Sequence, residues 1–266
     1  MIHFTKVALL MIGLCCLSFK PQYDEFCGKR NTAFKADEKV TMKIFYTTLG
    51  MYVGAGEATF TTTLERFNGK PVYHCVGEGK SYSFFDSFFK VRDRYESYID
   101  TTNLLPMKFI RNVDEGGHKI YNNVTFNQSA KTAASTNGVF KIGDCIQDVV
   151  SAVYYARNIN FDKYKVDDKI PFDMFLDDEV YHLYIRYMGK EKIKTRYGKF
   201  NAIKIKPLLI KGTIFEGGEK MNAWLSDDPN HLLLRVESPI AVGSVKIDMM
   251  GYNNLRYPLT SFRGLN

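Results

Sequence analysis

The sequence lacks the residue patterns that most enzyme classes require. Its 266 residues contain no Gly-x-Ser-x-Gly elbow, no P-loop and no dinucleotide-binding fingerprint, so the nucleophile elbows and phosphate-binding loops of the best-known enzyme folds are not encoded. The five histidines are scattered and no Cys-x-x-Cys pair occurs, which argues against a preformed zinc site. The sequence therefore predicts no catalytic residue, no cofactor and no metal ligand.

The remaining titratable groups have simpler explanations. Three pairs of neighbouring aspartates occur where turns are expected, and aspartate at a turn is explained by its hydrogen bonds to nearby backbone N–H groups. His74 and Cys75 adjoin each other. They lie in a strand-like segment, in which successive side chains point to opposite faces, so they cannot form a nucleophile–base dyad. An enzyme is the less favoured prediction.

Long apolar runs are also scarce, and the longest lies at the N-terminus. Residues 7–17 follow Lys6 without a charge, but they are fewer than the ~20 residues that span a bilayer. Residues 1–18 are predicted to be a signal peptide that is removed on export. Lipid anchoring through Cys15 or Cys16 and an uncleaved anchor remain alternatives. Export places the protein in the periplasm, or at the outer membrane, of a Gram-negative bacterium and excludes nucleic acid as a partner.

Three cysteines remain after cleavage, namely Cys27, Cys75 and Cys145. Cys75 lies inside a strand-like segment and resembles a small buried hydrophobe, whereas the other two lie outside regular strands. Because an oxidising compartment permits disulfides, a bridge between Cys27 and Cys145 is predicted, with Cys75 as a free thiol. Three free thiols are the alternative.

The chain's main pattern is the alternation of apolar and polar residues that is typical of half-buried strands. Val40, Met42, Ile44 and Tyr46 alternate with less apolar neighbours. The pattern recurs in residues 55–64, 181–187, 200–209, 232–236 and 243–249. Turn signals such as Asn68-Gly69 separate these runs. The fold class is therefore all-β and mainly antiparallel, a meander of about a dozen strands.

Two segments depart from this alternation. Residues 144–157 carry apolar side chains at helical spacing, with Asp144 as N-cap and Gln147 in capping-box position. This central amphipathic helix is expected to cover one opening of the sheet or to pack on its concave side. Residues 83–90 would form a short aromatic helix with Ser81 or Ser83 as N-cap. Its four phenylalanines, which would share one face, are Phe84, Phe85, Phe88 and Phe89.

These four rings have two interpretations. They either lie at the mouth of a barrel-like sheet and gate a ligand or contact a membrane, or they plug an ordinary core and never meet solvent. The aromatic residues of the whole sequence allow the same two interpretations. Its 20 Phe and 17 Tyr suit the wall of a partly wet cavity as well as a core. The net charge of +7 would favour anionic lipid or glycan, although solvated strand faces explain it equally.

Several stretches resemble the exported bacterial family catalogued as domain of unknown function 3108. They are Asn31-Thr32-Ala33-Phe34, residues 38–46, 55–58 and 147–157, Trp224-Leu225-Ser226-Asp227-Asp228, Glu237-Ser238-Pro239 and residues 242–245. The resemblance implies a secreted or periplasmic protein with one β-rich domain, and it supplies no catalytic residues. Its form is similar to the open barrels of periplasmic lipoprotein carriers, which is an analogy of fold.

Together these observations predict a strongly curved, open or partly closed β-barrel-like sheet with one central helix and one short aromatic helix. The predicted parts are a signal peptide (1–18), an extended segment (19–36), a β-rich domain (37–258) and a C-terminal tail (259–266). The predicted function is a non-enzymatic envelope protein that binds a hydrophobic or amphiphilic ligand. The alternatives are a structural or protein-interaction protein with a filled core and, less favoured, a hydrolase of envelope glycans or lipids.

Overall fold

Strands account for most of the chain in a computed structural model that describes residues 26–48, 51–211, 217–240 and 243–265. The signal peptide predicted at residues 1–18, with Cys15 and Cys16, lies outside this described part. The first strands are β1 (Lys39–Thr48), β2 (Met51–Phe67), β3 (Lys70–Ser81), β4 (Val91–Asp100), β5 (Pro106–Glu115), β6 (His118–Asn127), β7 (Thr132–Ser135) and β8 (Gly138–Lys141). The later strands are β9 (Lys169–Leu176), β10 (Glu179–Lys194), β11 (Lys199–Pro207), β12 (Asn222–Ser226), β13 (Leu233–Pro239), β14 (Ser244–Asn253) and β15 (Phe262–Gly264).

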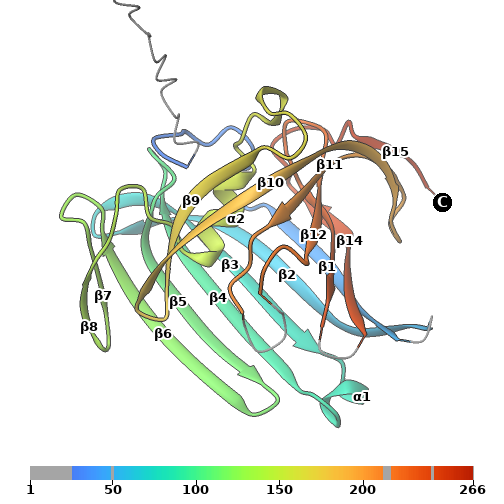
Figure 1. Ribbon diagram of the computed structural model, residues 1–266, viewed down its shortest axis with the longest axis horizontal. Helices are drawn as coiled ribbons and strands as arrows, with labels where there is room; N and C mark the ends of the chain where they lie inside the picture. The colour runs from blue at the N-terminus through green and yellow to red at the C-terminus, as the bar shows by residue number, and fades with distance from the viewer. Residues whose placement is uncertain (1–25, 49–50, 212–216, 241–242, 266) are drawn as a thin grey trace, which may run out of the picture.

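These strands form one fifteen-stranded sheet made of two antiparallel meanders (Figure 1). The first meander runs from β1 to β8, and the second runs from β9 to β14, which returns to pair with β1. The sheet edges are therefore β8 and β9, two strands that lie close together in the sequence. The sheet curves strongly without closing, which confirms the predicted fold class. It has more strands than the dozen expected.

The simple alternation along β1 fails because both of its faces are partly covered. The pairing of β1 with β2 shifts between Ile44 and Phe45, but the extra residue, Ala55, lies in β2, so the side chains of β1 keep their alternation. Phe45 points to the face opposite to that of Val40 and Met42 and is buried there, while Ile44 and Tyr46 are only partly covered. The predicted face of Val40, Met42, Ile44 and Tyr46 is therefore buried at its first two members only.

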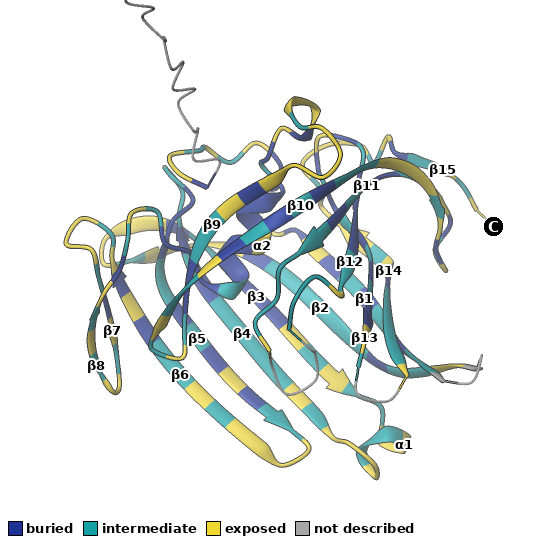
Figure 2. Ribbon diagram, viewed as in Figure 1, coloured by how far each residue is buried: buried dark blue, intermediate teal, exposed yellow. Residues whose placement is uncertain are grey.

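The core lies between the two meanders, around the helix α2 (Val149–Ala156). This helix contacts β3 and β4 on one side and β9 on the other. Buried positions gather along α2 and the strand segments that face it (Figure 2). Aromatic rings dominate the largest fully buried side chains, which include Tyr155, Phe26, Phe34, Phe109, Phe161 and Phe175. The interior is thus occupied by the helix and by rings.

The helix begins later than its sequence pattern predicts. Asp148, rather than Asp144, is the N-cap, and Ser151 completes the capping box in place of Gln147. Two constraints hold the preceding residues out of the helix. Cys145 has a left-handed backbone, with φ 55°, and Gln147 forms a parallel β-bridge with Met174 of the edge strand β9. The helix is about one turn shorter than its pattern predicts, because Gln147 instead forms backbone hydrogen bonds with the edge strand β9.

Both terminal segments are integrated more closely than expected. Phe26 and Phe34, in the predicted extended segment, are buried in the core. At the other end, the predicted tail contributes β15, which pairs with β11. Phe262 of this strand packs against a second hydrophobic cluster that contains Trp224 and Phe200. In the described residues, Phe26 and Phe34 on one side and β15 on the other therefore pack with the core and the sheet.

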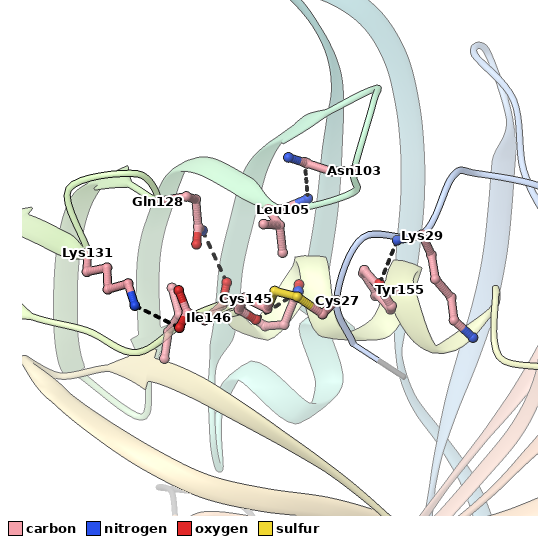
Figure 3. Close-up of a disulfide and its surroundings, with 11 residues drawn as sticks. Cys27, Lys29, Asn103, Leu105, Gln128, Lys131, Cys145, Ile146 and Tyr155 are labelled. Atoms are coloured by element: carbon pink, nitrogen blue, oxygen red, sulfur yellow. Dashed lines mark hydrogen bonds and ion pairs between the residues drawn. A yellow bond between two sulfur atoms is a disulfide. The ribbon is translucent and has the colours of Figure 1, made fainter. Parts of the chain in front are cut away.

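A disulfide joins Cys27 to Cys145, with a Cα–Cα distance of 5.2 Å (Figure 3). This is the pairing expected from the sequence. Cys75 is a buried free thiol. The bridge ties the N-terminal segment to the residues that lead into α2, across 118 positions of sequence. The backbone N–H of Lys29 also donates to the Tyr155 hydroxyl at 3.0 Å. The segment is therefore fastened to α2 covalently and by a hydrogen bond.

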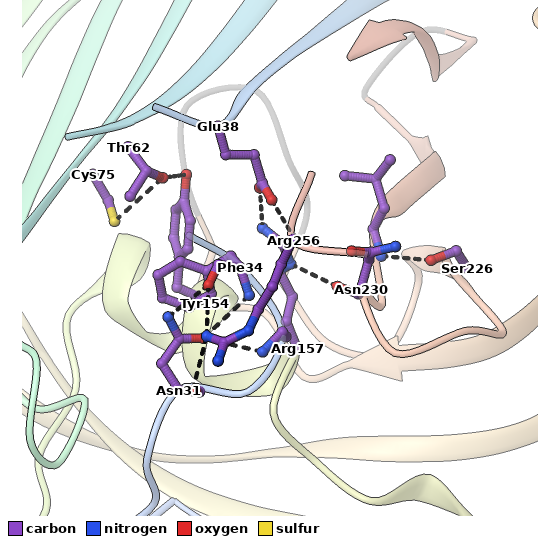
Figure 4. Close-up of polar contacts among 12 residues, drawn as sticks. Asn31, Phe34, Glu38, Thr62, Cys75, Tyr154, Arg157, Ser226, Asn230 and Arg256 are labelled. Carbon is purple, nitrogen blue, oxygen red and sulfur yellow. Dashed lines mark hydrogen bonds and ion pairs between the residues drawn. The ribbon is translucent and has the colours of Figure 1, made fainter. Parts of the chain in front are cut away.

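A buried ion pair fixes the other end of α2. Arg157 donates to both carboxylate oxygens of Glu38, at 2.5 and 3.1 Å (Figure 4). Its Nε donates to the carbonyl oxygen of Asn230 at 3.1 Å, and the Phe34 ring lies 5.4 Å from the guanidinium carbon. These contacts join the start of β1, the end of α2 and the loop between β12 and β13.

The disulfide can be tested by Cys27→Ser combined with Cys145→Ser. Closing a loop of this length restricts the unfolded chain, so we expect the variant to lose about 2–5 kcal/mol of unfolding free energy. Denaturant titration followed by the fluorescence of Trp224, the single tryptophan, measures the loss. A reductant should destabilise the wild type and leave the double variant unchanged; equal stabilities of the two proteins would show that the bridge contributes nothing.

The ion pair can be tested by a double-mutant cycle with Glu38→Met and Arg157→Met. Each single change leaves one buried charge without its partner, and we expect a loss of about 3–5 kcal/mol for each. The double variant should be less destabilised than the sum, because neither charge is then stranded. The same denaturant titration gives all four stabilities. Additive effects would mean that the two side chains act independently.

Candidate functional site

The most exposed apolar feature lies at the connection between β3 and β4, which contains the helix α1 (Ser83–Asp86) at the lower right of Figure 1. The helix is shorter than the predicted residues 83–90, and its N-cap is Tyr82, which makes no side-chain capping bond. Ser81 instead accepts the Val91 N–H at 2.8 Å and donates to Asp86. This cross-connection closes the loop after one turn.

The four phenylalanines of this connection, here called the aromatic tip, divide into two anchored and two projecting rings. Phe85 meets Tyr46 of β1, with ring centroids 6.5 Å apart, and Phe89 packs so closely over Gly116 that a Cβ there would lie 2.5 Å from its ring. Phe84 and Phe88 are 68% and 76% exposed, and their centroids lie 5.7 Å apart.

These exposures decide between the two interpretations of the aromatic segment. A plug whose rings never meet solvent is wrong, because Phe84, Phe88 and Phe89 are all exposed. No pattern in the sequence indicates this exposure, since four closely spaced phenylalanines are equally expected in a core. The rings are outside because the connection extends beyond the curved sheet, where none of the described helices or strands covers Phe84 and Phe88. Gating of a ligand stays a prediction.

Aromatic and basic side chains of β1 and β2 adjoin the aromatic tip. The Lys43 ammonium lies 5.9 Å from the ring centroid of Tyr82, the residue that precedes α1, and 5.5 Å from that of Phe45. Tyr52 and Val53 are exposed on β2. Aromatic rings beside ammonium groups are the side chains found where a protein meets the headgroup region of a membrane.

The interior holds polar groups of another kind. The Thr62 hydroxyl donates to the Tyr154 hydroxyl at 2.9 Å and lies 3.8 Å from the Cys75 sulfur (Figure 4). Burial raises the pKa of the Cys75 thiol, so the thiolate needed by a nucleophile is disfavoured. His74 bonds instead to Glu65 and Glu96, at 2.9 and 2.8 Å. The neighbouring His74 and Cys75 therefore serve separate environments and form no dyad.

Asp148 is the other buried titratable group. Its carboxylate accepts the backbone N–H groups of Val150 and Ser151, each at 2.8 Å, and the Ser97 hydroxyl at 2.6 Å. Burial nevertheless raises its pKa to about 7. The residue is fully buried, so substrate has no access to it. Its arrangement is that of a helix cap fixed to β4.

Two cavities stand out in the described part of the chain, and neither is an apolar chamber. One, of about 560 Å³, lies over β2 to β6 and is lined by alternating charges such as Glu78, Arg94 and Asp114. The other, of about 410 Å³, lies beside Phe45 and Tyr52 and is lined by four cationic side chains. Most of the residues that line each cavity are charged or polar, whereas the binding chamber of a carrier is lined mainly by hydrophobic and aromatic side chains.

Among the residues that the structure describes, no three histidine, cysteine, aspartate or glutamate side chains gather in a way that would hold a metal ion. Within the same residues, no helix has the length and apolar character needed to cross a membrane.

Comparisons with known proteins place the fold. A family model described as "Protein of unknown function (DUF3108)" matches residues 39–250, which confirms the resemblance seen in the sequence. A β-barrel-like protein of the domain of unknown function DUF1849 from Brucella abortus is 6% identical, with a TM-score of 0.52 over 83% of this chain and 98% of its own. At this identity the likeness shows the fold alone.

Two other solved structures are less similar. A Bacteroides fragilis protein described as exported, with a YmcC-like fold, is 8% identical and has a TM-score of 0.34 over 83% of this chain and 97% of its own. A Parabacteroides distasonis protein described as a lipoprotein is 11% identical, with a TM-score of 0.35 over 84% of this chain and all of its own. No curated protein is significantly similar in sequence.

The titration of Asp148 can be tested with Asp148→Asn, which keeps an acceptor for the helix cap and removes the carboxyl. The folded-state pKa of about 7 lies above the ordinary 3.8, so the stability that the bound proton provides is complete below about pH 4 and is lost as the pH rises through about 7. Relative to the wild type, the variant should therefore gain stability over that range, by at most about 1.4 kcal/mol per pH unit. Denaturant titrations at a series of pH values measure the difference, and a difference that does not change with pH would contradict the assignment.

Proposed function

Because the chain belongs to the DUF3108 family of proteins of unknown function, whose description assigns no activity, we propose a function from the geometry: the protein is a non-enzymatic envelope protein that binds lipid through its aromatic tip. The observation that carries the proposal is the pair of projecting rings, Phe84 and Phe88. Export rests on the apolar run of residues 7–17, which lies outside the described residues.

The exposed rings are supported from below, and this favours a binding role. Phe85 and Phe89 hold the loop on Tyr46 and Gly116, and Arg92 pairs with Asp86 at 2.6 Å. A loop fastened in this way presents Phe84 and Phe88 without collapsing over them. Burying one such ring in an apolar phase is worth ~1.5–3 kcal/mol, and contiguous exposed apolar patches typically mark interaction sites.

In this proposal the lipid binds at the rim of the curved sheet and not in a cavity inside it. α2 and the aromatic core fill the space between the meanders, and the two cavities described above have charged walls. An amphiphile is therefore better accommodated at the rim, where its apolar part meets the aromatic tip and its polar part meets cations. The membrane is the natural source of such molecules in a bacterial envelope.

A protein partner is the second candidate, favoured by the filled core. The same exposed rings would then dock on an apolar surface of another envelope protein. Vesicle binding distinguishes the two functions, because a lipid-binding protein binds vesicles without any other protein. A hydrolase receives less support, since the buried Cys75 and Asp148 are closed to substrate.

The proposal can be tested with the double variant Phe84→Ser, Phe88→Ser. We expect its binding to vesicles of phosphatidylethanolamine and phosphatidylglycerol to weaken at least about tenfold, because the two rings that would be partly buried in the membrane are removed. Binding is measured by co-sedimentation. Its melting temperature should stay within a few degrees of the wild type, since neither ring is in the core.

The matched control is Leu64→Ser with Tyr121→Ser, which removes two side chains of similar exposure, 58% and 59%, from β2 and β6. It should bind vesicles as the wild type does. Failure of the wild type to bind vesicles would overturn the lipid function and leave the protein-partner candidate; equal weakening in both double variants would show that the aromatic tip has no special role.

A further inference from the structure

The second cavity, here called the basic pocket, lies where β1 and β14 meet the turn between β10 and β11. It encloses about 410 Å³ between the rings of Phe45 and Tyr52 and the cationic side chains of Lys194, Arg196, Arg235 and Lys246. One carboxylate, Asp248, shares this lining. Four cations against one anion make the pocket electropositive.

Two of these cations are already neutralised. Arg235 donates to Asp248 through Nε at 2.6 Å and through a terminal nitrogen at 2.9 Å, and the backbone N–H of Arg196 takes a further acceptor site of the same carboxylate. Lys246 pairs with Glu237 at 2.6 Å. Asp248 is therefore saturated by donors and leaves the other two cations of the pocket without compensation.

Lys194 and Arg196 are the uncompensated pair. Neither side chain has a carboxylate partner among the residues that the structure describes, and both are exposed at the turn. The Arg196 guanidinium carbon lies 5.2 Å from the centroid of Phe45 and 5.9 Å from that of Tyr52. Stacking on a ring occupies the face of a guanidinium and leaves its N–H edge free to donate.

We propose that the basic pocket binds the phosphate group of an anionic lipid headgroup. A forked guanidinium beside an ammonium matches a phosphate, which accepts several charge-assisted hydrogen bonds. The volume exceeds that of a bare phosphate and falls in the range of small-ligand sites, and its ring walls suit the less polar part of a headgroup. The inference deepens the proposed function, because it names the lipid class that the protein prefers.

The position of the pocket agrees with this preference. Lys43 bridges the two features, with its ammonium near both Phe45 of the basic pocket and Tyr82 at the base of the aromatic tip. Figure 1 shows the β1–β2 hairpin and α1 at the same end of the sheet. Phe45 and Tyr52 of this hairpin line the basic pocket, so both features lie at that end. A membrane reached by the projecting rings would present its headgroups on the same side of the molecule.

The test uses soluble lipids, so that it does not depend on membrane insertion. Binding of dihexanoyl phosphatidylglycerol, dihexanoyl phosphatidylcholine and inorganic phosphate is measured by titration calorimetry with the wild type and with Lys194→Gln, Arg196→Gln. We expect the wild type to prefer phosphatidylglycerol and the variant to bind it at least about tenfold more weakly, because two charge-assisted contacts are lost. Both substituted residues are exposed, so the melting temperature should be unchanged.

The control variant is Lys192→Gln, Lys199→Gln, which removes two exposed lysines of the same pair of strands that do not line the pocket. It should bind phosphatidylglycerol as the wild type does. Equal weakening in the two variants would overturn the inference in favour of general electrostatic attraction. Inorganic phosphate that binds as tightly as phosphatidylglycerol would overturn the headgroup assignment and indicate a site for free phosphate.

The inference and the proposed function can fail separately. If vesicle binding depends on Phe84 and Phe88 while soluble phosphatidylglycerol does not bind, the lipid function stands and the basic pocket is not a headgroup site. If the pocket binds the soluble lipid and vesicles do not bind, the site stands and the aromatic tip has another role.

Discussion

The buried ion pair between Glu38 and Arg157 is the contact on which the interior depends. Two charges taken out of water are tolerated only when they satisfy each other and their remaining donors, and here the Asn230 carbonyl and the Phe34 ring complete the environment. The pair therefore fixes the end of α2 against the first strand of one meander and a loop of the other. With the disulfide at its opposite end, the helix has no freedom to leave the space that a carrier protein would keep for its ligand.

The seam between the two edge strands follows from the same placement. Gln147, just before the helix, exchanges backbone hydrogen bonds with Asp173 and Phe175 of β9, each at 2.9 Å. Across the gap, Asn137 donates to Asp178 at 2.6 Å, and the Phe140 and Phe175 rings lie 5.8 Å apart. Side chains and one short segment thus seal what backbone pairing leaves open. An unpaired edge would otherwise invite association with other strands.

Because the interior is filled, the rim of the sheet is where a ligand would bind. The aromatic tip and the basic pocket lie at the same end of the sheet, with Lys43 close to both; one is apolar and the other is cationic. Neighbouring apolar and cationic surfaces suit an amphiphile, because its tail needs apolar surroundings and its headgroup needs polar ones. The buried Cys75, Asp148 and Tyr154 serve packing and capping, and their raised pKa values record burial rather than chemistry.

Local patterns in the sequence determined the antiparallel strands, the existence of a central helix, the family resemblance and the pairing of Cys27 with Cys145, because alternation, helical spacing and cysteine placement are properties of short segments. Tertiary structure decided the rest. The N-cap of α2 is Asp148 and not the predicted Asp144, because Gln147 pairs with the edge strand β9. The exposure of Phe84 and Phe88 depended on where the β3–β4 connection extends beyond the sheet. The basic pocket joins Phe45 and Tyr52 to residues 194–196 and to Arg235, Lys246 and Asp248. No local pattern predicts it, since the pairing of β14 with β1 brings these distant parts of the sequence together.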